Sequence, residues 1–337
     1  MKAAVFLGVG KWHVEQRPDL DPGAGQVLVE LQAAGVCRTD THIFRGEFPA
    51  QFPVVPGHEF SGIVRQVGPR VAGLSVGQRV SVDPVIACGW CEYCRRSKPH
   101  FCRNFTALGV DIDGGFATHC LVPAANAYPV QDGVSADEAA LAEPIACCIH
   151  GLELAAPAAG DCVAILGSGW IGLLMVQLAL IHGAGRVVVS EKLAPRRDLA
   201  AALGAHAAID PGAPDADRRL RDECGGGADL VIECAGASET NRQAIALARD
   251  GGCVLVFGVA PPQAEITVRP YEIYRRELRV IGAFSTPRKH AAALSLLAGK
   301  RLKVEPMITH RFGLDQLGEA LETLTQAKGV KVMVMPR

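Results

Sequence analysis

Hydrophobic and polar residues alternate in short runs along roughly the first 145 residues. Runs of this kind, bounded by turn residues, have the period of two that is typical of strands with one buried face. They cover residues 27–32, 62–67 and 79–83. The pattern predicts a β-rich lobe, and a last apolar run at 330–335 could add one more strand to it.

The pattern changes after about residue 158. Short, continuously apolar strands now alternate with helix-forming segments, which predicts a doubly wound parallel sheet buried on both faces. The expected strands are 161–167, 186–191, 228–234, 252–258 and 278–284, and the expected helices are 171–182, 195–203 and 289–298. The chain is therefore predicted to be an α/β protein with two domains, residues 1–145 plus 281–337 and residues 146–280.

A glycine-rich turn joins the expected strand at 161–167 to the helix after it. Its residues are Gly167, Ser168, Gly169, Trp170, Ile171 and Gly172. In this pattern the first glycine permits a tight turn, the second lets a pyrophosphate approach the backbone, and the third lets helix and strand pack closely. The positive end of the helix dipole then faces the phosphates. The turn predicts a dinucleotide site; a generic βαβ turn is the alternative.

Glu191 ends the next strand, nineteen residues beyond Gly172, where an acid is expected to bind the ribose hydroxyls. A carboxylate there accepts hydrogen bonds from the 2′- and 3′-hydroxyls and repels a 2′-phosphate, which favours NAD over NADP. The neighbouring Lys192, Arg196 and Arg197 could neutralise a phosphate if Glu191 turned away. NADP therefore stays an alternative.

Four cysteines lie within fifteen residues, at C-x2-C-x2-C-x7-C spacing: Cys88, Cys91, Cys94 and Cys102. A short loop of this kind can surround a tetrahedral Zn²⁺ without help from the rest of the chain. Four thiolates leave no open coordination position, so we expect this zinc to be structural.

A second group of metal-ligand residues is spread along the first lobe. Cys37 lies near Thr39 and His42, and His58 is followed by Glu59. Glu143 stands in an apolar run, where a carboxylate is costly to bury unless a charged partner or a metal satisfies it. A thiolate, an imidazole and a carboxylate would leave a fourth position on Zn²⁺ for water or substrate.

Composition limits the remaining possibilities. The chain has 337 residues and nearly balanced charges, with 34 Lys and Arg against 35 Asp and Glu, so neither a nucleic acid nor an anionic membrane is expected as a partner. No apolar stretch is long enough to span a bilayer, and the N-terminal apolar run is too short for an export signal. Seven further cysteines, mostly in apolar runs, are interpreted as small reduced core residues: Cys120, Cys147, Cys148, Cys162, Cys224, Cys234 and Cys253. A reducing, cytoplasmic location is expected.

These motifs, in this order along the chain, resemble the zinc-dependent medium-chain alcohol dehydrogenase family over essentially the full length. The resemblance implies a GroES-like catalytic domain, a Rossmann domain, and a catalytic zinc held by Cys37 and His58. Glu143 stands where the simple alcohol dehydrogenases have a third ligand, a cysteine, and this resembles the polyol (sorbitol-type) and threonine dehydrogenases. In those branches Glu59 can be a direct ligand, with Glu143 either bound or holding the metal's water.

The same resemblance implies further roles. Thr39 would hydrogen-bond the reacting hydroxyl, and His42 would pass its proton to solvent. Lys331 matches a basic residue that the family uses on the pyrophosphate, and Phe284 lies on the loop beside the nicotinamide. The catalytic zinc would lower the pKa of the substrate hydroxyl, and hydride would pass to the nicotinamide.

The expected activity is the oxidation of a secondary alcohol, such as a polyol or sugar alcohol, to a ketone with NAD. Two zinc ions per subunit are expected, one catalytic and one structural. L-Threonine 3-dehydrogenase is the alternative enzyme, and a catalytically silent dinucleotide-binding protein with structural zinc is the alternative without activity. By analogy with the family we expect a homo-oligomer, with a tetramer favoured over a dimer.

Overall fold

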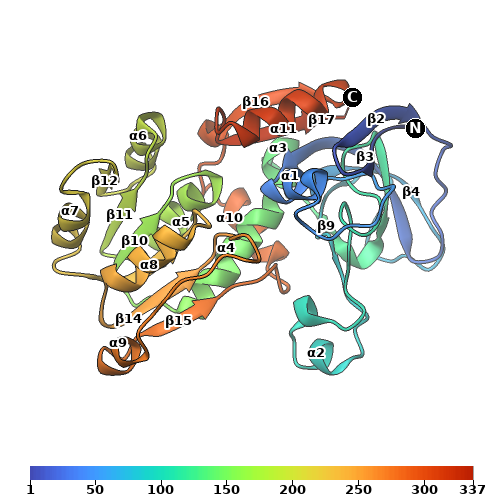
Figure 1. Ribbon diagram of the computed structural model, residues 1–337. Coiled ribbons are helices and arrows are strands. Elements are labelled where there is room, and N and C mark those ends of the chain that lie inside the picture. The colour runs from blue at the N-terminus through green and yellow to red at the C-terminus, as the bar shows by residue number, and fades with distance from the viewer. Residues whose placement is uncertain (337) are drawn as a thin grey trace. The chain divides into compact units, whose positions relative to one another are not determined.

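A computed structural model describes residues 1–336, whose contacts divide the chain into two units (Figure 1). Unit 1 holds Met1–Ala146 and the C-terminal residues from Thr286 on, and unit 2 holds Cys147–Ser285. The chain returns to unit 1 five residues later than the predicted position 281. The predicted boundary at 281 comes too early, because strand β15 (Arg279–Gly282) pairs with β14 (Ala248–Val256) in the sheet of unit 2.

Unit 1 is built on a seven-stranded sheet in the order β16-β17-β3-β4-β5-β9, with β8 paired to β3. Its strands are β3 (Gln26–Val36), β4 (Glu59–Val67), β5 (Arg79–Val82), β8 (His119–Pro123), β9 (Ala127–Pro129), β16 (Ile308–Gly313) and β17 (Lys331–Met335). Strand β17 pairs antiparallel with β3, so the last strand joins the first lobe as predicted. Two further two-stranded sheets are formed by β1 (Lys2–Gly8) with β2 (Lys11–Gln16) and by β6 (Val85–Ile86) with β7 (Thr106–Ala107).

The alternating pattern of the sequence becomes the core of this unit. The inward-facing positions of the strands are buried, and the largest apolar side chains of this core are Phe6, Phe60 and, from the segment before β8, Phe116. Burial of such side chains contributes roughly 1.5–3 kcal/mol each, which holds the sheet to its covering segments.

Short helices connect the strands of unit 1. They are α1 (Arg38–Arg45), α2 (Glu92–Arg95), α3 (Ala136–Ala140), α10 (His290–Ala298) and α11 (Leu317–Thr325), with single 3-10 turns at Pro99–Phe101, Ala124–Asn126, Glu305–Met307 and Leu314–Gln316. Helix α1 begins directly after β3, with Cys37 as its N-cap, and ends at Gly46, whose φ of +73° suits a glycine. The sequence analysis did not predict α1.

Unit 2 contains a six-stranded sheet in the order β12-β11-β10-β13-β14-β15, and every neighbouring pair is parallel. The strands not yet placed are β10 (Cys162–Leu166), β11 (Arg186–Ser190), β12 (Ala207–Ile209) and β13 (Ala228–Glu233). Numbered within the unit this order is 3-2-1-4-5-6, the arrangement of a doubly wound dinucleotide-binding sheet. The predicted α/β fold with a β-rich lobe and a parallel sheet is confirmed.

The helices of unit 2 lie between its strands. They are α5 (Trp170–Ile181), α6 (Ala194–Ala202), α7 (Ala216–Glu223), α8 (Ser238–Leu247) and α9 (Pro270–Arg275), while α4 (Ala142–Ala155) begins in unit 1 and continues into unit 2. Helix α5 is apolar almost all round and buried from Gly172 to Ala179, as a helix packed between a sheet and other elements must be. Within residues 1–336, no helix is long and apolar enough to cross a bilayer.

Candidate functional site

The antiparallel pairing of β3 and β4 brings the predicted zinc ligands of unit 1 together. Gly35 of β3 is the register partner of Glu59, the first residue of β4. Cys37 follows β3 by one residue and His58 precedes β4 by one, so both lie at the same end of this strand pair. One ligand atom each from Cys37, His58 and Glu59 lies within 4.8 Å of the other two.

This donor set suits Zn²⁺. A thiolate, an imidazole nitrogen and a carboxylate oxygen are its usual protein ligands, and three of them leave a fourth tetrahedral position open. His58 and Glu59 are buried, with 8% and 1% of their surface exposed, and Cys37 is half-buried. A site of this kind can hold a metal and still admit a small molecule.

Asp40 supports two of the three ligands from inside the protein. Its side chain is fully buried, and its Oδ2 accepts a hydrogen bond of 2.8 Å from the backbone N–H of Cys37. Its Oδ1 lies 3.4 Å from His58 Nδ1, close enough for an ion pair but without hydrogen-bond geometry. Burial lowers the pKa of His58, but the charges of Asp40 and Cys37 outweigh it and hold the pKa well above its usual value. Asp40 thus lies beside one nitrogen of the ring, where a carboxylate can orient a histidine that binds a metal through the other.

Helix α1 carries both residues expected to handle the substrate proton. Thr39 Oγ1 lies 3.6 Å from Cys37 Sγ, next to the group of three ligands. His42 stands three residues further, on the same face of the helix, and its Nδ1 lies 2.6 Å from Glu47 Oε2. The His42 side chain is 29% exposed.

Glu59 also forms an ion pair with Lys331 of β17. The Lys331 ammonium contacts Glu59 Oε2 and donates a hydrogen bond of 3.1 Å to the carbonyl of Val36, and both charged side chains are 2% exposed. Gly35 makes room for the pair, because a Cβ at that position would lie 2.1 Å from Glu59 Oε2. A role of Lys331 at the pyrophosphate stays a prediction; the structure places its ammonium on the carboxylate of Glu59.

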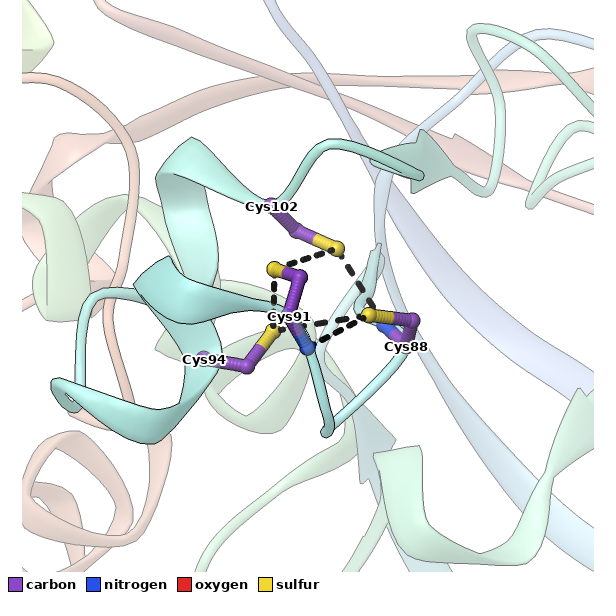
Figure 2. Close-up of side chains that lie close together, drawn as sticks. All are labelled: Cys88, Cys91, Cys94 and Cys102. Carbon is purple, nitrogen blue, oxygen red and sulfur yellow. Dashed lines mark hydrogen bonds between the residues drawn. The ribbon is translucent and has the colours of Figure 1, made fainter.

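The four-cysteine loop forms a closed cluster (Figure 2). Cys91 Sγ lies 3.6 Å from Cys94 Sγ and 3.9 Å from Cys102 Sγ, and Cys88 Sγ lies 3.9 Å from Cys94 Sγ. A tetrahedron with Zn–S bonds of about 2.3 Å has edges of about 3.8 Å, so these four atoms already have the spacing of a zinc-thiolate site. Backbone N–H groups of Cys94 and Arg103 lower the pKa of Cys91 to about 6, which favours the thiolate that a metal needs.

The glycine-rich turn lies at the carboxyl end of β10 in unit 2. Gly167 has a φ of +92°, which glycine adopts without strain. A Cβ at Gly172 would lie 2.0 Å from the carbonyl oxygen of Gly167, so helix and turn can pack this closely only because the residue has no side chain. At Gly169 the nearest atom beyond its chain neighbours would be Arg196 Nη1, 3.8 Å away. The first and third glycines therefore shape the turn, and the second leaves open space above it.

Glu191 lies directly over this turn. Its Oε2 accepts a hydrogen bond of 2.8 Å from Ser168 N and its Oε1 one of 2.9 Å from Leu193 N. The residue is 8% exposed. Each carboxylate oxygen has a further lone pair, so the held carboxylate can still accept from ribose hydroxyls.

Comparison with known proteins finds a family model for each part of the chain. Residues 23–132 match the alcohol dehydrogenase GroES-like domain, and residues 171–299 match the zinc-binding dehydrogenase domain. The chain is 33% identical to D-arabinitol dehydrogenase 1 of Uromyces fabae, over 92% of this chain and 90% of that protein. It is 34% identical to L-threonine 3-dehydrogenase of Pyrococcus furiosus, over 93% of this chain and 92% of that protein.

The chain belongs to the zinc-dependent medium-chain alcohol dehydrogenase family. A solved structure from Sinorhizobium meliloti, described as a zinc-binding dehydrogenase bound to NADP, superimposes with a TM-score of 0.96 at 40% identity and covers 99% of both chains. For this medium-chain alcohol dehydrogenase, an oxidoreductase activity on a CH–OH group with a dinucleotide cofactor follows from the family. NAD and NADP are not separated by these relatives.

Some predicted residues of this dehydrogenase lie outside the clusters described above. Glu143 is in the first turn of α4 and is not part of the group formed by Cys37, His58 and Glu59. Trp170 and Ile171 form the first turn of α5, behind the glycine turn, and Phe284 follows β15 with 53% of its surface exposed.

The sequence analysis missed two residues that the site uses. Asp40 had a local signal, since an acid three residues after Cys37 is in the position of a capping box, which the structure confirms for α1. Glu47, the partner of His42, had none, because it follows the end of a helix that the pattern did not predict.

Proposed function

We propose that the protein oxidises a secondary alcohol of a polyol or sugar alcohol to the ketone, with NAD as the hydride acceptor. The observation that carries this proposal is the convergence of Cys37, His58 and Glu59 in unit 1, with the hydroxyl of Thr39 beside them. The similarity to a D-arabinitol dehydrogenase supports a polyol as the substrate class.

Bound zinc would supply a Lewis acid that favours the alkoxide of the substrate, and the nicotinamide would accept hydride. The residues of the chain would position these groups and provide the charges around them. Cys37, His58 and Glu59 would hold the metal, and Asp40 would orient His58 through Nδ1. Glu143 is proposed to act near the same metal, bound to it or to its water, as in the polyol branch.

The proton of the substrate hydroxyl is proposed to leave along α1. Thr39 would accept it at Oγ1, and His42, held by Glu47, would release it to solvent. Thr39→Ser keeps a hydroxyl at this position and should retain most of the turnover, whereas Thr39→Val should lower kcat by about 10²–10⁴-fold. Equal turnover of Thr39→Val and Thr39→Ser would contradict this role.

NAD is proposed because the Glu191 carboxylate is held over the glycine turn by two backbone N–H groups. A carboxylate in this position accepts from the ribose hydroxyls and repels a 2′-phosphate. Phe284 beside the nicotinamide and Arg196 beside the glycine turn are proposed as further cofactor contacts.

L-Threonine oxidation at C3 is the second candidate, favoured by 34% identity to the enzyme of Pyrococcus furiosus. The two candidates are separated by initial rates of NAD reduction with D-arabinitol, sorbitol and xylitol against L-threonine, on zinc-loaded protein. The proposal expects kcat/KM for at least one polyol to exceed that for L-threonine by a factor of ten or more. A higher value for L-threonine than for every polyol would replace it by the second candidate.

A further inference from the structure

A pair of thiols lies at the amino end of the sheet in unit 2, at the opposite end of β10 from the glycine turn. Cys162 is the first residue of β10, and Cys224 is the residue at which α7 ends. Both are free cysteines, they belong to one buried cluster, and they line the same cavity. The sequence analysis interpreted both as inert core residues; their pairing, across 62 positions of the chain, requires the fold.

Both thiols border an open cavity of about 510 Å³. Its lining residues are Cys162, Arg186, Asp222, Glu223, Cys224 and Gly225. The two cysteines are only 8% and 2% exposed, so the cavity gives a small molecule access while larger thiol reagents meet covered sulfur atoms. A reagent of the size of hydrogen peroxide fits this geometry.

The charges around the pair distinguish the two sulfur atoms. The neighbouring Cys224 thiol lowers the pKa of Cys162, and the cationic side chains of Arg249 and Arg186 act in the same direction against burial and the charge of Asp229. The neighbouring Cys162 and burial raise the pKa of Cys224. Of the two thiols, Cys162 is therefore the one that loses its proton more readily. Since the thiolate is the nucleophile, Cys162 is the residue that reacts first.

Arg186 adds a second feature to this cavity. Its Nη2 is paired with Glu223 and its Nε is buried without a hydrogen-bond partner among residues 1–336. A buried donor without a partner costs about 1–3 kcal/mol, and an anionic sulfur or oxygen in the cavity is the kind of acceptor it lacks.

We propose that Cys162 and Cys224 are a reversible oxidation site, converted by hydrogen peroxide into an intramolecular disulfide. The Cys162 thiolate attacks one peroxide oxygen, so that an S–O bond forms, the O–O bond breaks and hydroxide leaves. Cys224 then attacks the sulfur of this sulfenic acid; the S–S bond forms, the S–O bond breaks, and the second oxygen leaves as water. Two thiols and one peroxide thus give one disulfide and two waters, and a thiol reductant reverses the change.

The disulfide would join the end of α7 to the start of β10 and leave the glycine turn unchanged. We therefore expect the oxidised protein to bind the dinucleotide within about twofold of the reduced protein and to unfold at a higher temperature, because the crosslink closes a long loop of the unfolded chain. The disulfide would protect the two thiols from irreversible oxidation while the enzyme stays active.

The test uses reduced, zinc-loaded, full-length protein treated with a few equivalents of hydrogen peroxide. Remaining thiols are then alkylated, and the peptides are analysed by mass spectrometry with and without dithiothreitol. We expect a linked pair of peptides that contain Cys162 and Cys224, lost on reduction. In Cys224→Ser, dimedone present while the oxidised protein is unfolded should trap a sulfenic acid on Cys162, whereas in Cys162→Ser the thiol of Cys224 should stay alkylatable after unfolding.

Cys253→Ser is the matched control, since Cys253 is a buried cysteine of the same sheet, and this variant should form the linked peptides at the wild-type rate. The proposal is overturned if both thiols of the wild type stay fully alkylatable after peroxide, if Cys162 proceeds to sulfinic acid with no disulfide, or if the only disulfides join the zinc-loop cysteines. The wild-type experiment decides the matter even where a variant fails to fold.

Discussion

Lys331 and Glu59 form an ion pair in the interior of unit 1, between strands that are 272 positions apart in the sequence. Both side chains are 2% exposed, so the ammonium of Lys331 compensates a buried negative charge on Glu59. Glu59 belongs at the same time to the group that could hold the catalytic zinc. The pair thus links the C-terminal strand to the metal site.

Replacement of Lys331 should reveal this link. Lys331→Met leaves Glu59 as a buried carboxylate with no cation, which costs about 3–5 kcal/mol when one partner of such a pair is removed. Zinc would supply positive charge to the same carboxylate, so the loss should be larger in protein stripped of metal than in zinc-loaded protein. Urea unfolding of both forms measures this difference. Lys331→Arg, which keeps the charge, is the control, and equal losses with and without zinc would contradict a contact between Glu59 and the metal.

Two glycines of the same turn should respond differently to a methyl group. At Gly172 the new Cβ would meet the Gly167 carbonyl oxygen at 2.0 Å, so Gly172→Ala should destabilise unit 2 by about 1–3 kcal/mol or more. At Gly169 the nearest atom is 3.8 Å away, so Gly169→Ala should fold normally but bind the dinucleotide at least tenfold more weakly. Thermal unfolding and fluorescence titration with the reduced cofactor measure the two effects, and unchanged binding by Gly169→Ala would refute this placement of the pyrophosphate.

Glu191 should decide between the two cofactors. Glu191→Ala removes the carboxylate that repels a 2′-phosphate and leaves Arg196 and Lys192 nearby, so the ratio of kcat/KM for NAD to that for NADP should fall by about tenfold or more. The measurement is a pair of initial-rate series at fixed alcohol. If the wild-type enzyme already prefers NADP, the choice of NAD is wrong.

Asp83 makes the stability of unit 1 depend on pH. Burial raises its pKa from 3.8 to about 6, against a hydrogen bond from the N–H of Val85. The folded chain therefore binds this proton more tightly than the unfolded chain, so the contribution to stability is full below about pH 4, is lost as the pH rises through 6, and is constant above that. The shift corresponds to roughly 2–3 kcal/mol.

Asp83→Asn carries no charge at any pH and keeps an oxygen for the N–H of Val85. It should match the wild type near pH 4 and be more stable near pH 8, and the difference between the two unfolding curves isolates Asp83 from other groups. One such group is His290, whose burial lowers its pKa to about 3 and which acts in the opposite direction below pH 6.5. A constant difference between pH 4 and pH 8 would contradict the raised pKa.

The parts of the site that the sequence predicts are those whose residues are close along the chain. The cysteine loop carries all four ligands within fifteen residues, and the strand, glycine turn and helix of unit 2 are continuous. In each motif the residue spacing alone determines how the side chains are placed, so the sequence predicts the arrangement. Strands with a clear period of two are predicted in the same way.

The contacts that the sequence does not predict depend on strand register. The pairing of Gly35 with Glu59 puts Glu59, rather than the equally plausible Glu143, into the group with Cys37 and His58. The contact of Lys331 with Glu59 likewise requires β17 to lie beside β3. The sequence analysis likewise did not predict α7, which begins at Ala216, because helix formation in such a polar stretch depends on packing of its few apolar residues.

The most direct test of the account is zinc content measured together with turnover, in the wild type, in His58→Ala and in Cys91→Ser. The wild type should hold two zinc ions per chain. His58→Ala should hold one zinc ion, reduce NAD at least about 10³-fold more slowly and keep its affinity for the dinucleotide. The main effect of Cys91→Ser should be a lower unfolding temperature. Full turnover by a His58→Ala protein that contains only the zinc of the cysteine loop would contradict the catalytic role of Cys37, His58 and Glu59.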